Sequence, residues 1–123
     1  MSVISFCAIL GLGLGSFVGF LGLFVPRKIA FLVGISAKTQ EGVAEIRLVH
    51  GGFFLFLEII AALLWFGHHI DLGIAIAGLV WIGAVLGRLL SLLLDAKQPE
   101  NGAASMIFEA VIGFLHLAVW MQA

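Results

Sequence analysis

Four long apolar stretches, separated by short polar segments, make up most of the chain. They cover about residues 3–25, 43–66, 72–94 and 103–121. At about 1.5 Å per helical residue, each can cross a hydrocarbon core about 30 Å thick. A further apolar segment at about 29–35 is too short to cross and is predicted to lie along the membrane surface. The pattern predicts an all-α fold, an integral membrane four-helix bundle, with residues 1–123 as one four-span transmembrane domain.

The composition excludes a soluble protein and several kinds of site. The chain is 63% hydrophobic and 11% charged, whereas soluble domains are about 45–50% apolar and about 25% charged. No basic run suggests nucleic acid as a partner. A single cysteine, Cys7, excludes an intrachain disulfide and any cysteine-based metal or redox motif. The adjacent His68 and His69 are predicted to be solvated loop residues. We therefore expect no metal and no cofactor.

The basic residues predict the orientation of the spans. All of them lie in the first and third loops, or on helices close to those loops: Arg27, Lys28, Lys38, Arg47, Arg88 and Lys97. Positive charge marks the cytoplasmic side of a membrane protein. We therefore expect a multi-pass protein of a bacterial inner membrane whose first and third loops are cytoplasmic. Both termini then lie outside, in the periplasm, and Trp65 and Trp120 belong to one outer aromatic belt.

Glycines recur at helical spacing in three of the spans. Gly11, Gly15 and Gly19 repeat every four residues, a pattern that lets two helix backbones approach closely in lipid. They would pack against another helix of the same chain or against a partner. A glycine pair inside a span indicates close packing, a kink or ligand access. The candidate helix-packing glycines are Gly11, Gly15, Gly19, Gly51, Gly52, Gly83 and Gly87.

Ionisable and polar side chains inside the spans are the candidate functional residues. Charges in hydrocarbon are costly, so their presence there suggests a functional site. We group the candidates as a polar seam inside the bundle, which would bind a ligand or hold the helices together. Its predicted members are Arg47, His50, Glu58, Arg88, Ser91, Asp95, Glu109 and His116.

Helix geometry predicts how the deeper residues pair. Arg88 is seven residues before Asp95, and Glu109 is seven after Gly102, so each lies about 10 Å inside the cytoplasmic boundary. Two opposite charges at equal depth on consecutive helices should form an ion pair. His50 is predicted to lie at a similar depth on the second span.

The remaining seam residues are assigned from their helical faces. Glu58 and His116 lie at comparable depth and could form a hydrogen bond, or Glu58 is protonated because burial disfavours a carboxylate. Arg47 and Glu58 are eleven residues apart, nearly three α-helical turns, and should share a face with His50. Ser91 and Asp95 continue the Arg88 stripe at i+3 and i+7.

Three functions fit this pattern. The seam could line a cavity that binds or conducts a lipid-soluble molecule, such as a lipid or quinone-like ligand, or a proton or ion. The protein could instead be an accessory or structural subunit of a homo-oligomer or larger membrane complex, associating through its glycine-rich first span. Acid–base catalysis at Glu58 or Glu109 is a third possibility, but no nucleophile, metal or cofactor motif supports it. The seam could also be a static clamp between helices.

The order and spacing of the polar positions resemble one known family. The pattern consists of Glu45-x-Arg47, Gly51-Gly52, Gly87-Arg88-x-x-Ser91-x-x-x-Asp95 and Glu109. It resembles a bacterial family of small four-helix inner-membrane proteins, a domain of unknown function, over roughly residues 40–115. His50 stands where that pattern has an aromatic residue, often tyrosine. The resemblance implies the architecture and the location, and it implies no catalytic residue.

Overall fold

The computed structural model describes residues 1–67, 70–94 and 102–122, without the side chains of residues 70, 71, 87 and 91. All of its regular elements are helices. In chain order they are α1 (Val3–Phe24), α2 (Pro26–Leu32), α3 (Gln40–Ile46), the π-helix η1 (Arg47–Phe53), α4 (Phe54–Phe66), α5 (Ile70–Leu94) and α6 (Gly102–Gln122).

Four helical segments are long and apolar enough to cross a membrane, as predicted. They are Val3–Phe24, Gln40–Phe66, Leu72–Leu94 and Gly102–Gln122, and the protein is a multi-pass membrane protein. The second segment begins three residues before the predicted position. Thr39 caps it, since the Thr39 hydroxyl accepts a hydrogen bond from the Gly42 backbone N–H at 3.0 Å, as N-cap residues do.

The short apolar segment forms α2, which begins three residues before the predicted start at residue 29. Pro26 cannot continue α1, because it lacks a backbone N–H, but it fits the first turn of a new helix. Gly34, with φ of 76°, follows the end of α2 in the left-handed region that glycine adopts readily. The position of α2 along a membrane surface stays a prediction.

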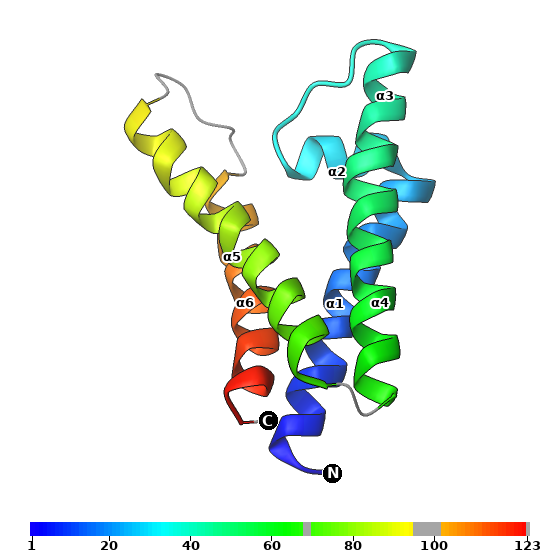
Figure 1. Ribbon diagram of the computed structural model, residues 1–123. Coiled ribbons are helices and arrows are strands. Elements are labelled where there is room, and N and C mark those ends of the chain that lie inside the picture. The colour runs from blue at the N-terminus through cyan, green and yellow to red at the C-terminus, as the bar shows by residue number, and fades with distance from the viewer. Residues whose placement is uncertain (68–69, 95–101, 123) are drawn as a thin grey trace.

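The long helices form two arms that meet at one end (Figure 1). One arm contains α5 and α6, and the other contains α1, α3, η1 and α4. We call the region where they meet the vertex. Here α1 contacts α6 and α4 contacts α5. Both chain termini lie at the vertex end, and α2 lies between the arms towards the opposite, open end (Figure 1). The packed core at the vertex consists of Ala8, Leu12, Ala61, Ile74, Ala77 and Val119.

Glycines of α1 allow this close packing. A Cβ at Gly19 would lie 2.6 Å from the backbone nitrogen of Leu55, and one at Gly22 would lie 2.5 Å from the backbone of His50 and Gly51. A Cβ at Gly15 would collide with the Glu58 carboxyl group. The glycine face of α1 is therefore covered within the chain, which is one of the two predicted alternatives, and association with a partner stays a prediction.

Two other predicted helix-packing glycines make no such contact within the described chain. A Cβ at Gly83 would have no atom of the described chain within 4 Å, and a Cβ at Gly52 would meet only the Arg47 carbonyl oxygen at 4.0 Å. Both glycines point away from the helix contacts. The spacing of glycines alone could not predict this, because it does not specify which face of a helix is covered. Gly51 does pack, with its Cβ position 2.5 Å from the Leu23 backbone nitrogen. The side-chain position of Gly87 lies outside the described residues.

Candidate functional site

A cavity of about 760 Å³ lies between the arms. Small-molecule sites typically have about 300–1,000 Å³. Its walls are mainly apolar and come from α1, α2, α4, α5 and α6, with Leu21, Leu32 and Phe108 among them. Four polar side chains also line it: His50, Arg88, Ser105 and Glu109. The cavity thus combines a large apolar surface with a small polar group.

The predicted Arg88–Glu109 ion pair forms the centre of this polar group. Arg88 Nε donates to Glu109 Oε2 at 2.7 Å, and Arg88 Nη2 donates to Glu109 Oε1 at 2.8 Å. The side chains keep 23% and 13% of their surface exposed, so neither is sealed off. Two parallel hydrogen bonds fix the guanidinium relative to the carboxylate. They also leave the Nη1 donors of Arg88 outside the pair.

His50 contributes a polar atom whose hydrogen-bonding capacity is unused. Its ring is half-buried, and its Nδ1 is buried without a hydrogen-bond partner among the described residues. Most buried polar side-chain atoms in proteins have a partner. His50 lies in η1, and π-helical turns occur frequently at functional sites. The unpartnered nitrogen on a cavity-lining residue therefore indicates that the cavity takes a ligand or water.

A second polar group lies closer to the vertex and is completely buried. Glu58 and His116 are 0% and 1% exposed, and His116 Nε2 lies 3.0 Å from Glu58 Oε2, as predicted. Trp81 Nε1 donates to Glu58 Oε1 at 2.7 Å. We call Glu58, Trp81 and His116 the buried triad. It joins α4, α5 and α6, and it faces Gly11 and Gly15 of α1, where a Cβ would meet His116 and Glu58.

The hydrogen bonds of His116 define the protonation of the triad. His116 Nδ1 lies 2.8 Å from the Ile112 carbonyl oxygen, which can only accept, so Nδ1 carries a proton. One further proton then lies between His116 Nε2 and Glu58 Oε2. Whichever atom holds it, the pair is neutral as a whole. A neutral pair avoids the cost of burying a net charge.

Trp81 is the site residue that the sequence analysis missed. Its position in the middle of the third span was the available signal, because a buried indole N–H usually finds an acceptor. Its ring packs on Phe54 with centroids 4.7 Å apart, and both rings line the cavity. The polar seam is therefore not continuous. Phe54 and Trp81 form an aromatic floor between the cavity and the buried triad.

Arg47 is not brought together with the other predicted seam residues, because it does not line the cavity. Its side chain is exposed, and Arg47 Nε donates to the Leu23 carbonyl oxygen at 2.8 Å, near the end of α1. The predicted shared face with Glu58 assumed α-helical turns throughout. The π-helix between them has wider turns, so the rotation from Arg47 to Glu58 differs. Glu45 is exposed as well.

Replacing Arg47 with glutamine should have a small effect. The exposed hydrogen bond to Leu23 would weaken, which costs about 1 kcal/mol of unfolding free energy. Ligand binding in the cavity should be unchanged, because Arg47 does not line it. Unfolding of the purified variant in SDS titrations measures the first quantity. A large loss of binding to the cavity would show that Arg47 belongs to the site after all.

Two other predicted seam residues cannot be placed. The Ser91 side chain and Asp95 lie outside the described residues, as do His68 and His69. Ser105, which was not predicted, lines the cavity and donates from its hydroxyl to the Leu32 carbonyl oxygen at 2.9 Å. It thereby links α6 to the end of α2.

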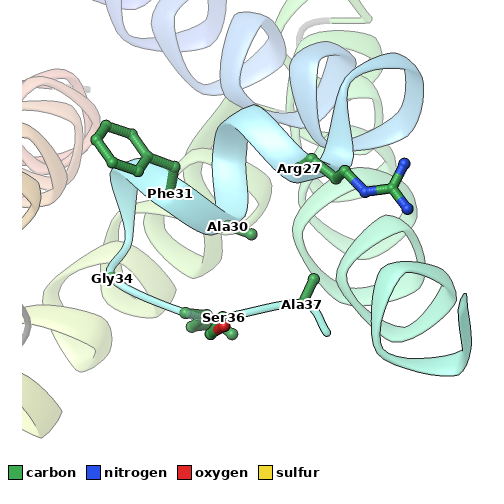
Figure 2. Close-up of a pocket in the computed structure, with 7 residues that line it drawn as sticks. Arg27, Ala30, Phe31, Gly34, Ser36 and Ala37 are labelled. Carbon is green, nitrogen blue, oxygen red and sulfur yellow. The ribbon is translucent and has the colours of Figure 1, made fainter. Parts of the chain in front are cut away.

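A second, smaller cavity of about 370 Å³ lies between α2 and the segment that follows it. Arg27 and Phe31 extend to opposite sides of α2 there, and Ser36 and Ala37 lie below the helix (Figure 2). None of the predicted seam residues lines it. The larger cavity is therefore the candidate functional site.

Comparison with known proteins identifies the family and no function. No curated protein and no solved structure matches the chain. One family model matches residues 3–121, and its description is "Domain of unknown function (DUF4345)". Because this match covers almost the whole sequence, the four-span chain with its interarm cavity belongs to the DUF4345 family.

Proposed function

We propose that the protein binds a lipid-soluble small molecule with one polar end in the cavity between its arms. The observation that carries this proposal is the composition of the cavity wall. A volume of about 760 Å³ is enclosed mainly by apolar side chains, with His50, Arg88, Ser105 and Glu109 as polar groups. An apolar pocket with a few polar groups is typical of a small-molecule site.

The buried triad supports binding rather than conduction. Glu58, His116 and Trp81 are buried, and their hydrogen bonds are made within the protein. Of the three, Trp81 lines the cavity as part of the aromatic floor, whereas Glu58 and His116 do not line it. A metal or other ion entering from the cavity would have to displace these contacts, whereas a ligand in the cavity would leave them intact. We assign the triad to holding the arms together.

We also propose where the cavity lies in the cell. The positive-inside rule places the loops after α1 and α5 in the cytoplasm of a bacterial cell. The cavity would then lie in the cytoplasmic half of the inner membrane, and both termini would lie outside. Residues 1–123 would form one transmembrane domain. The lipid bilayer would supply the ligand.

Filling the cavity should remove the ligand. Ala84 lines the cavity, and Ala84→Phe would place a ring inside it. The neighbouring Gly83→Phe is the matched control, because the Gly83 position is exposed with no atom of the described chain within 4 Å. Mass spectrometry of solvent extracts from the purified proteins should show a lipid-soluble molecule retained by the wild type and Gly83→Phe. Ala84→Phe should retain at least about tenfold less, which corresponds to about 1.4 kcal/mol.

Equal lipid profiles in all three proteins would contradict the proposal. Near-ultraviolet circular dichroism of both variants is needed beside the extracts, since a misfolded Ala84→Phe protein would lose the ligand for another reason. A folded Ala84→Phe variant that keeps the same molecule in the same amount would show that the cavity is not its site.

A further inference from the structure

The charges at the polar end of the cavity restrict the chemical class of its ligand. Glu109 uses both carboxylate oxygens on Arg88, at 2.7 and 2.8 Å, so the positive charge of Arg88 is compensated within the protein. Among the described residues that line the cavity, no other lysine, arginine, aspartate or glutamate is present. The polar end therefore has no surplus charge to balance a charged ligand.

A charged head group would bind less tightly in this cavity than an uncharged one. An anion near Arg88 would also lie near Glu109, and a cation near Glu109 would lie near Arg88. Bringing an ion out of water into an apolar site costs free energy that only a full counter-charge offsets. An uncharged head group loses far less solvation.

The hydrogen-bonding atoms that the Arg88–Glu109 pair leaves unused favour a polar head group. The Nη1 donors of Arg88 are outside its pair with Glu109, and they suit a carbonyl or hydroxyl oxygen. His50 Nδ1 has no partner in the part of the chain that the structure describes, and a hydroxyl group can donate to it or accept from it. An oxygen-bearing, uncharged head group uses these atoms without breaking the ion pair.

We infer that the cavity ligand is an uncharged lipid whose polar end carries a hydroxyl or carbonyl group, and not a fatty acid anion or an anionic phospholipid. This inference rests on the proposed binding function and specifies its ligand class. Free long-chain alcohols, glycerides and isoprenoid quinones share the required chemistry. The apolar walls take the chain, and Arg88 and His50 take the oxygen.

Trp81 provides a direct reporter of occupancy. It lines the cavity and lies seven residues before Arg88 on α5, or about 10 Å along the helix axis. A long-chain probe whose oxygen reaches Arg88 can therefore bring a mid-chain bromine close to Trp81 and quench its fluorescence. In a Trp65→Phe/Trp120→Phe background, Trp81 is the remaining tryptophan, because the chain has three.

The test compares three probes with the same mid-chain dibrominated tail and different heads. They are the alcohol, the methyl ester and the carboxylic acid, the last at a pH where it is ionised. Each is titrated into nanodiscs that hold the full chain, with its concentration expressed as a mole fraction of the lipid. The alcohol and ester should quench Trp81 saturably and at least about tenfold more tightly than the acid, about 1.4 kcal/mol.

A charge variant makes the prediction sharper. Glu109→Gln leaves the Arg88 charge uncompensated, so the preference should reverse in favour of the carboxylate. Glu45→Gln is the matched control, because Glu45 is exposed on α3 away from the cavity, and it should keep the wild-type order. If Glu109→Gln does not fold, the double variant Arg88→Gln/Glu109→Gln removes both charges and should still prefer the alcohol.

The outcomes separate this inference from the proposed function. Saturable quenching in which the acid binds as tightly as the alcohol, or more tightly, would overturn the uncharged class and leave the cavity as a binding site. Absence of saturable quenching by any of the three probes would overturn both. Quenching that persists unchanged in Ala84→Phe would also overturn both, because the probe would then bind elsewhere.

Discussion

Gly22→Ala should destabilise the fold more than any other single methyl group added to α1. The new Cβ would lie 2.5 Å from the backbone of His50 and Gly51, and backbone atoms cannot move aside as a side-chain end can. Inserting a group into a packed region typically costs about 1–3 kcal/mol, occasionally more. We expect a loss of about 3 kcal/mol or more, because α1 and η1 would have to separate along their whole contact.

The measurement is the unfolding free energy in SDS titrations, followed by far-ultraviolet circular dichroism. Gly13→Ala on the same helix is the control, because the Gly13 position is exposed and has no atom of the described chain within 4 Å. It should be neutral or slightly stabilising, since alanine favours helix. Equal stability of the two variants would show that the close contact between α1 and η1 does not support the fold.

Glu58→Leu should be about as damaging, because it removes a partner from a buried pair. The leucine would leave Trp81 Nε1 and His116 Nε2 without their partner in a completely buried site. Removing one member of a buried pair typically costs about 3–5 kcal/mol. Glu58→Gln should retain most of the stability, because its amide oxygen can accept from Trp81 and its amide nitrogen can donate to His116.

Unfolding titrations distinguish the two substitutions at Glu58, and Trp81 fluorescence reports whether the indole keeps its environment. Glu45→Leu is the matched control at an exposed glutamate and should change the unfolding free energy by well under about 1 kcal/mol. A Glu58→Leu protein as stable as the wild type would mean that the triad does not hold α4 to α5 and α6.

The membrane-spanning helices were predictable because their signal is local. Each span is an uninterrupted apolar stretch, and Thr39, Pro26 and Gly34 only shift or end helices by a few residues. The Arg88–Glu109 pair was also predictable, since two charges at equal depth on consecutive helices have few other partners. The Glu58–His116 contact follows from depth in the same way.

The positions of Arg47 and Gly52 differ from expectation for one reason, the change of helix type. A seven-residue π-helix from Arg47 to Phe53 cannot be recognised from apolar periodicity, and it rotates Arg47 away from Glu58. It also decides that Gly51 packs against α1 while Gly52 does not. The divergence of the arms, and hence the cavity, depends on which faces are covered over the full length of each helix. Reasoning from one residue pair at a time cannot show which helix faces are covered.

The Arg88–Glu109 pair and the buried triad join different helices. The Arg88–Glu109 pair joins α5 to α6, within one arm. The buried triad joins α4 to that arm near the vertex. Towards the open end, the Ser105 hydroxyl reaches across to the Leu32 carbonyl oxygen.

The angle between the arms can therefore change without breaking the Arg88–Glu109 pair. Opening would turn the α5–α6 arm about the vertex and would move Arg88 and Glu109 together, away from His50 on the other arm. A molecule that touches α1 and α5 at once would favour one angle over others. If the proposed ligand contacts both arms, its binding would therefore also favour one angle between them.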